Sequence, residues 1–205
     1  MEKPIHPIQL SDAALLACLT GLPAGVTETW LSRGLRPLVC AEPTAGYAAG
    51  IPAHALHKLG AAWELTRRAM EQSMREQPIQ LTTPGLVRDY LHLLLAARSY
   101  EVFVVLYLDA KNHLIEAEEL FRGTLTQTSV YPREVVMGAL SPHRNAAAVI
   151  FAHNHPSSGC AEPSRADEHL TALLKTALAL VDIKVLDHFV VASDGVVSFA
   201  ERGLL

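Results

Sequence analysis

The stretch AAAVIFAHNHPSSGCAEPSRAD, residues 146–167, joins an apolar run to a polar loop and then to the start of a helix. The apolar residues 146–152 predict a buried strand. Side chains two positions apart on a strand share a face. His153 and His155 are therefore expected to point the same way, off the end of this strand.

The second half of the stretch predicts a loop followed by a helix. Gly159 and Pro163 are typical of a loop, and a helix is expected from Ser164, with Asp167 in its first turn. Ser-x-x-Asp is also a capping pattern, so it has a purely structural interpretation. Capping and metal binding are compatible, and two imidazoles with one carboxylate suffice for a catalytic zinc that keeps its fourth position for water.

The order His-x-His, short loop, Ser-x-x-Asp resembles the JAMM motif of the MPN-domain metalloproteases, and its wording is similar to the bacterial RadC family. Three further segments are similar to RadC: VYPRE at 130–134, LDH at 186–188 and SFAERG at 198–203. The resemblance covers about residues 80–205, with fainter similarity toward the N-terminus. It implies an MPN domain, a three-layer α/β fold with a mixed β-sheet and flanking helices.

The resemblance also implies a site and an activity. His153, His155 and Asp167 are the implied ligands of Zn2+, and Ser164 is the implied hydrogen-bond donor to the oxyanion. The catalytic glutamate of the family corresponds to Glu101, at the start of an apolar strand. The implied activity is hydrolysis of a peptide or isopeptide bond in a peptide or protein substrate by a metal-activated water.

From the residues alone, the choice of base has alternatives. A glutamate at a strand start, such as Glu101, is also compatible with a solvated side chain without a role. Glu134 is the second candidate, although an acidic residue in a first helical turn is ordinary helix chemistry, and Glu162 in the loop is the third. Asp187 and His188 are expected on a neighbouring strand, either orienting a ligand or packed in the core.

The loop departs from the family pattern in length. Eight residues, 156–163, separate His155 from Ser164, where the family has seven. Loops tolerate insertions better than the elements that they connect. Cys160 lies beside the extra residue, and it is either an inert thiol or a thiolate that fills the open metal position and holds the enzyme off.

Composition sets limits on the class of protein. A formal net charge of -4 argues against a protein dominated by phosphate contacts. The three cysteines are odd in number and widely spaced, which indicates a reduced, cytoplasmic setting. The N-terminus lacks a signal-peptide pattern, and no apolar run approaches the ~20 residues of a membrane span, so no membrane partner is expected.

Residues 1–76 are expected to form a small all-helical domain ahead of the MPN domain at 80–205. In the RadC family this region resembles a helix-hairpin-helix, whose Gly-x-Gly turn presents main-chain amides to phosphate. Here the second glycine position is Pro52, which has no amide hydrogen, so the motif is degenerate. Packing or docking of a partner is favoured over nucleic-acid binding by this segment.

The remaining pattern predicts the elements of the second domain. We expect strands at 101–108, 113–121, 146–152, 185–192 and 196–199, with helices at 85–97, 132–140 and 164–181. The hypothesis is a zinc-dependent hydrolase. The alternatives are a DNA-associated repair or recombination factor that acts by binding, and a metal-bearing scaffold without catalysis.

Overall fold

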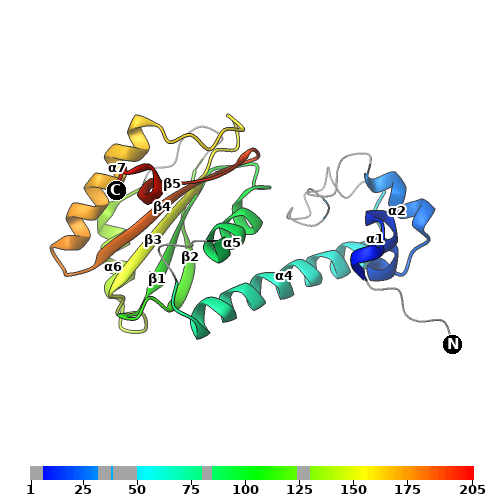
Figure 1. Ribbon diagram of the computed structural model, residues 1–205, viewed down its shortest axis with the longest axis horizontal. Helices are drawn as coiled ribbons and strands as arrows, with labels where there is room; N and C mark the ends of the chain where they lie inside the picture. The colour runs from blue at the N-terminus through cyan, green and yellow to red at the C-terminus, as the bar shows by residue number, and fades with distance from the viewer. Residues whose placement is uncertain (1–6, 32–37, 39–49, 80–84, 124–129) are drawn as a thin grey trace. The chain divides into compact units, whose positions relative to one another are not determined.

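A computed structural model describes residues 7–31, 38, 50–79, 85–123 and 130–205 (Figure 1). The chain divides into two compact units, Met1–Thr66 and Arg67–Leu205. The division falls inside the long helix α4 (Ala53–Glu76), whereas the sequence pattern suggests a border between residues 76 and 80. The last turns of α4 therefore belong to the second unit.

The second unit is built on a five-stranded sheet with the order β2-β1-β3-β4-β5. Its strands are β1 (Val102–Leu108), β2 (Leu114–Arg122), β3 (Ala148–Asn154), β4 (Lys184–Ala192) and β5 (Gly195–Ser198). β3 and β4 are parallel, and the other neighbouring pairs are antiparallel. The mixed sheet expected from the sequence is confirmed.

Helices cover both faces of this sheet, as Figure 1 shows. They are α5 (Gly85–Leu95), α6 (Pro132–Leu140), α7 (Arg165–Ala179) and the short α8 (Phe199–Arg202). α6 and α7 lie on one face, and α5 packs against β3, β4 and β5 on the other. This arrangement of a mixed sheet with flanking helices is the one that the sequence predicts.

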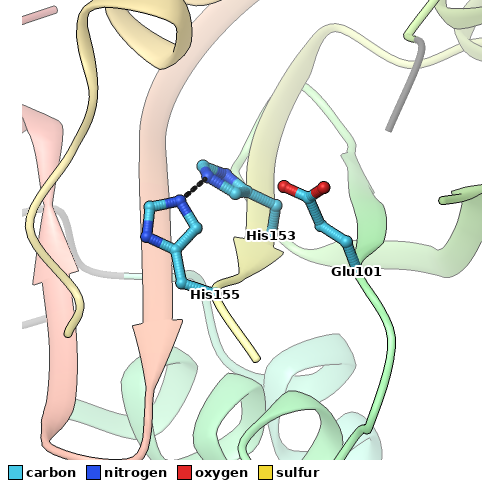
Figure 2. Close-up of side chains that lie close together, drawn as sticks. All are labelled: Glu101, His153 and His155. Carbon is cyan, nitrogen blue, oxygen red and sulfur yellow. Dashed lines mark hydrogen bonds between the residues drawn. The ribbon is translucent and has the colours of Figure 1, made fainter. Parts of the chain in front are cut away.

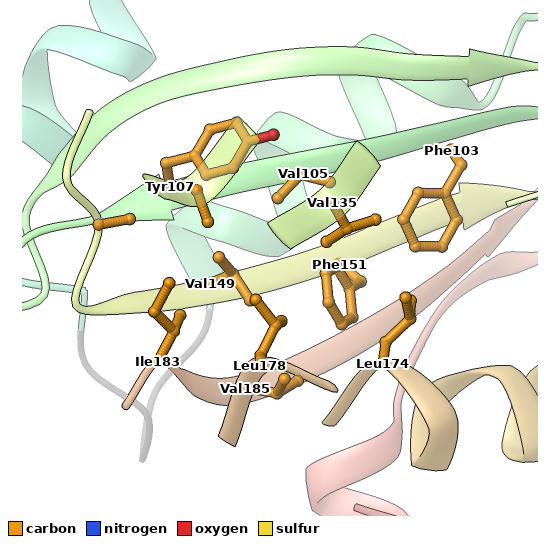
Figure 3. Close-up of a cluster of buried hydrophobic side chains, with 12 residues drawn as sticks. Phe103, Val105, Tyr107, Val135, Val149, Phe151, Leu174, Leu178, Ile183 and Val185 are labelled. Atoms are coloured by element: carbon orange, nitrogen blue, oxygen red, sulfur yellow. The ribbon is translucent and has the colours of Figure 1, made fainter. Parts of the chain in front are cut away.

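The core between the sheet and helices α6 and α7 follows from the alternation of side chains along the strands. Phe103, Val105 and Tyr107 of β1 point into it, and the residues between them point to the opposite face of the sheet. All are at most 1% exposed, together with their partners from β3, α6 and α7 (Figure 3): Val149, Phe151, Val135, Leu174 and Leu178. Burial of each such side chain contributes about 1.5–3 kcal/mol, so the sheet is a rigid base for the residues at its end.

Strand β3 runs further than its apolar sequence indicates. The predicted strand ends at residue 152, but pairing continues to His153 opposite Phe103 of β1, and to Asn154 opposite Val191 of β4. The main-chain amide of His155 donates to the carbonyl of Val191 at 2.8 Å. Neighbouring strands on both sides hold this polar end in place, so the His-x-His segment starts inside the sheet.

The link from β3 through α7 to the parallel strand β4 is a crossover connection, which places a helix start close to the carboxyl end of β3. Ligand sites of α/β sheets gather at carboxyl ends of strands. The segment between His155 and Ser164 is the turn of this crossover. The fold itself therefore brings the end of β3 and the first turn of α7 to one place.

In the first unit, the described regular structure is helical: a 3-10 turn (Pro7–Gln9), α1 (Asp12–Thr20), α2 (Ala24–Trp30) and the first part of α4. Ser11 caps α1, and Gly21 ends it at φ 79°. The buried side chains of this unit form a small apolar cluster: Leu16, Trp30, Leu38, Ala55 and Leu59. α4 begins directly after Pro52, a position that suits proline because a first-turn amide has no helical partner.

Across the part of the chain that the structure describes, none of the helices has both the length and the apolar character needed to cross a membrane.

Candidate metal centre

The end of β3 presents the two histidines of the His-x-His segment to one side. Their Nε2 atoms lie 3.0 Å apart, with ring centroids separated by 4.9 Å (Figure 2). His153 is 4% exposed because β1 and β4 flank it, whereas His155 lies just beyond the strand and is partly exposed. The alternation of side chains along an extended chain explains why both rings face the same space.

Asp167 reaches this space from the first turn of α7. Its Oδ1 lies 3.1 Å from Nε2 of His153, and its Oδ2 lies 3.5 Å from Nε2 of His155. The same carboxylate completes a capping box, in which it accepts from the main-chain amide and the hydroxyl of Ser164 at 2.7 and 2.6 Å. Capping and convergence with the histidines thus occur together at one side chain.

Glu101 stands directly before β1, on the other side of His153 from β4. It forms a group with His153 and His155 in which one ligand atom of each residue lies within 4.8 Å of the others. Figure 2 shows its carboxylate directed toward the ring of His153. Oε2 of Glu101 is buried and has no hydrogen-bond partner, so this oxygen is available to a ligand or a water molecule in the site.

Asn154, between the two histidines, faces the opposite way and holds the main chain around Glu101. Its Oδ1 accepts from the amide of Val102 at 2.8 Å, and its Nδ2 donates to the carbonyl of Tyr100 at 3.0 Å. The residues on both sides of Glu101 are therefore bound by one buried amide side chain. The distance from Glu101 to the histidines depends on this clamp.

The second ring nitrogen of each histidine has its own partner. Nδ1 of His155 lies 3.2 Å from the carbonyl oxygen of Cys160, to which it can only donate. Nδ1 of His153 lies 2.9 Å from Nε2 of His188. Metal-binding histidines are commonly oriented by such bonds from the nitrogen that does not bind the metal. In both rings this leaves Nε2 directed to the common space.

The charges at the site favour a cation. Burial opposes ionisation of Asp167, but its close contacts with His153 and His155 outweigh burial and hold the pKa of this carboxyl far below its ordinary value. The hydrogen bond with Asp167, assisted by the charge of Glu101, raises the pKa of His155. An ionised carboxylate beside two ring nitrogens is a set of donors that attracts a divalent metal ion.

The lengthened loop keeps its place through contacts with the turn between β4 and β5. Gly159, at φ 66°, accepts from the hydroxyl of Ser193 at 3.1 Å, and the amide of Ala161 donates to Asp194 at 3.0 Å. Cys160 is exposed and meets the site through its main-chain carbonyl, which accepts from His155. The extra residue is therefore compatible with convergence of the three side chains.

The other candidate carboxylates have different surroundings. Glu162 pairs with Arg202 at 3.1 Å, and Glu134 is an exposed residue in the first turn of α6. Of the three glutamates considered as bases, the structure brings Glu101 to the histidines.

Two contacts at this site lie beyond the sequence reasoning: the clamp of Asn154 around Glu101, and the bond of Thr171 to His188 at 2.6 Å. A signal existed for Thr171, since residues four apart share one face of a helix and Asp167 is four positions earlier. Asn154 offered the weaker signal of an amide inside an apolar strand, because a buried amide requires partners.

The fold and the site together define an α/β domain of the JAB type, with a candidate metal centre at the carboxyl end of its third strand. The family model described as RadC-like JAB domain matches residues 81–204, and the chain belongs to this family. The resemblance that the sequence motifs suggest is thereby confirmed.

Relatives cover almost the whole chain. A UPF0758 protein of Dechloromonas aromatica is 54% identical over 97% of this chain and 91% of its own length. A UPF0758 protein of Leptothrix cholodnii is 54% identical, with 98% of this chain and 93% of the relative covered. One from Albidiferax ferrireducens is 59% identical over 72% of this chain and 62% of its own length. The similarity thus extends into the helices that precede the JAB domain.

Proposed function

We propose that this protein is a zinc-dependent hydrolase of the JAMM class that cleaves a peptide or isopeptide bond. The observation that carries the proposal is the convergence of His153, His155 and Asp167 at the end of β3, with the carboxylate of Glu101 beside them. Membership of the RadC-like JAB family supports the same class of reaction.

The donor set fits a zinc ion. The Nε2 atoms of the histidines lie 3.0 Å apart, and the two oxygens of Asp167 lie 3.1 Å from His153 and 3.5 Å from His155, respectively. Two ligands at the usual bond lengths to a tetrahedral zinc are about 3.3 Å apart. Imidazole nitrogen and carboxylate oxygen are both ordinary zinc ligands. His153, His155 and Asp167 would hold the ion, which would supply Lewis acidity and lower the pKa of a water molecule to roughly 7.

Glu101 serves as the general acid and base. Its buried oxygen without a partner is suited to take a proton from the attacking water and to return that proton to the leaving amine. Asn154 positions Glu101 by binding the main chain on either side of it. A solvated glutamate without a role would have both oxygens in water.

Ser164 has a first task in orienting Asp167, because its hydroxyl donates to Oδ2 of that carboxylate. We retain for it a second task as a donor to the oxyanion that forms when water attacks a carbonyl. For this task the hydroxyl must turn from Asp167 toward the substrate. Only the hydroxyl hydrogen has to turn, so Oγ of Ser164 can still accept from the main-chain amide of Asp167, and the amide of Ser164 still donates to Asp167.

The test of this proposal measures the zinc bound per chain and the cleavage of cellular proteins. Protein purified without a tag is expected to carry about one zinc ion per chain, and His153→Ala is expected to lose it. Glu101→Gln should keep the metal and lose the ability to create new peptide termini when it is expressed in cells that lack the wild-type chain. Comparison of such termini between wild type and Glu101→Gln identifies the substrates.

Two outcomes would contradict the proposal. A folded wild-type protein that carries no divalent metal would refute the metal site. Zinc binding with identical termini in wild type and Glu101→Gln would instead indicate a metal-bearing scaffold without catalysis.

A further inference from the structure

A fully buried histidine, His188 in β4, has partners on both ring nitrogens. Its Nε2 lies 2.9 Å from Nδ1 of His153, and its Nδ1 lies 2.6 Å from the hydroxyl of Thr171 in α7. Its ring stacks on Phe199 with centroids 4.8 Å apart, and the edges of Phe103 and Phe151 enclose it. The aromatic rings therefore hold the plane of the imidazole, and the two hydrogen-bond partners distinguish its nitrogens.

Three hydrogen bonds link Asp167, Thr171, His188 and His153 in series. The carbonyl oxygen at one end of this series determines which group donates in each bond. The hydroxyl of Thr171 donates to the carbonyl oxygen of Asp167 at 2.6 Å, because a carbonyl can only accept. A hydroxyl has one hydrogen, so Thr171 must accept from Nδ1 of His188. A neutral imidazole with its hydrogen on Nδ1 then accepts at Nε2, and Nδ1 of His153 is the donor.

This series of hydrogen bonds ends at the candidate metal centre. With its hydrogen on Nδ1, a neutral His153 keeps the lone pair of Nε2 for a metal ion in the space that it shares with His155 and Asp167. The chain of bonds thus runs from the main chain of one implied ligand, Asp167, through Thr171 and His188 to the ring of another, His153. Every hydrogen in it has one acceptor.

We propose that His188 and Thr171 are positioning residues that set the tautomer of His153 and fix its distance to the α7 turn carrying Asp167. This inference rests on the proposed metal site. Metal-binding histidines usually donate to a carboxylate or a carbonyl, and a carboxylate raises the basicity of the ligand. A neutral imidazole as acceptor orients His153 without adding negative charge to the site.

The first experiment reads the tautomers in the metal-free protein by 15N–1H NMR of the imidazole rings. Wild type is expected to show His188 with its hydrogen on Nδ1. Thr171→Val removes the acceptor for that hydrogen at nearly constant volume, and a shift of His188 toward the Nε2-protonated form is expected. Thr171→Ser restores the hydroxyl and should restore the wild-type signals.

The second experiment measures zinc affinity by competition with a chromophoric chelator. Thr171→Val is expected to bind zinc about 10–100-fold more weakly than wild type, and Thr171→Ser as tightly as wild type. Thr176→Val is the matched control, because Thr176 lies on the same helix and its hydroxyl makes the same type of bond, to the carbonyl of Ala172 at 2.9 Å, but on the exposed side.

His188 itself provides a further comparison. His188→Gln keeps one acceptor and one donor, and should retain more zinc affinity than His188→Leu. If His188→Leu does not fold, the Thr171 variants still test whether the bond between Thr171 and His188 sets the tautomer and the zinc affinity. A wild-type His188 with its hydrogen on Nε2, or a Thr171→Val protein with unchanged tautomers and affinity, would overturn the inference. If wild type binds no zinc, the proposed function fails, and the tautomers of the metal-free protein still test the chain of bonds.

Discussion

Asp167 is the residue at which the structural and the chemical interpretations of the sequence meet. Its carboxylate accepts from the main-chain amide of Ser164, the N-cap of α7, and contacts the Nε2 atoms of both histidines. Capping requires an oxygen acceptor, whereas binding of a divalent cation also requires negative charge. The two tasks can therefore be separated by a substitution that keeps the shape and removes the charge.

Asp167→Asn is that substitution. An asparagine oxygen still accepts from the main-chain amide of Ser164, and Ser164 remains the N-cap, so the helix start is retained. Loss of the charge beside His153 and His155 should lower the melting temperature of the metal-free protein, because the depressed pKa of Asp167 contributes to its stability. Zinc retention should be lost in equilibrium dialysis against a weak chelator. A variant that retains zinc with wild-type affinity would remove Asp167 from the ligand set.

At the scale of elements, β1 and β3 are joined by a side chain as well as by their pairing. Asn154 of β3 is 2% exposed and binds the main chain on both sides of Glu101. The end of one strand thereby fixes the start of its neighbour. The geometry between Glu101 and the histidines is a property of the strand pair.

Asn154→Ala leaves the amide of Val102 in β1 and the carbonyl of Tyr100, just before β1, without their partner. Each unsatisfied buried group costs about 1–3 kcal/mol, so unfolding in urea should show a loss on the order of 2 kcal/mol or more. Zinc affinity should fall less than catalytic turnover, because the ligands stay in place while Glu101 moves. Equal loss of both quantities would argue against a specific role in placing Glu101.

Helix α6 packs against the sheet through a close approach at Gly138. A Cβ atom there would lie 2.5 Å from the hydroxyl of Tyr107, a ring that is fully buried and covered by Arg144 at 4.3 Å. Tyr107 cannot easily yield, because its hydroxyl also donates to Glu118 at 3.0 Å. A residue larger than glycine must therefore push the helix or the ring away.

Gly138→Ala should destabilise the second unit by about 1–3 kcal/mol, as overpacking of a core does. Gly60→Ala in α4 is the control, since nothing lies within 4 Å of an added Cβ there and alanine favours a helix interior by about 1 kcal/mol. Chemical denaturation of both variants checks the contrast. If Gly138→Ala leaves the free energy of unfolding unchanged, α6 does not approach Tyr107 as closely as the structure shows.

At the scale of the whole molecule, much of the organisation follows from local patterns. The apolar runs predicted β1, β3 and β4, and the proline start predicted α6 with the observed bounds Pro132–Leu140. The spacing of the histidines predicted that they point the same way, and the resemblance to the JAMM motif implied that Asp167 joins them. These features are local because they depend on the period of a strand or on the first turn of a helix.

What the patterns could not supply are contacts between elements distant in the sequence. The role of Asn154 depends on the start of β1, and that of Thr171 depends on His188 in β4. The same holds for the end of β3, which the neighbouring strands extend beyond its apolar residues. Contacts between distant segments determine the role of Asn154, the role of Thr171 and the end of β3. The secondary-structure propensities of single residues carry no information about such contacts.

Stability against acid should depend on an ion pair that ties β2 to the segment after α6. A hydrogen bond from Arg144 lowers the pKa of Glu116, with a further contribution from the charge of His143. Because the folded-state pKa is depressed, this stabilisation is present above the ordinary value of 4.5 and declines as the pH falls through the folded-state pKa.

Glu116→Gln should therefore lower the melting temperature at neutral pH, and the difference from wild type should narrow as the pH falls below 4.5. Melting curves of both proteins between neutral and acidic pH provide the check. A difference that stays constant with pH would show that packing of the side chain, and not its charge, stabilises the fold.

The most direct measurement is a crystal structure of zinc-loaded protein with anomalous scattering recorded on both sides of the zinc absorption edge. We expect one strong peak, bonded to Nε2 of His153, Nε2 of His155 and a carboxylate oxygen of Asp167, with Glu101 nearby and not bonded. A peak elsewhere on the chain, or a folded protein that binds no zinc at this site, would contradict it.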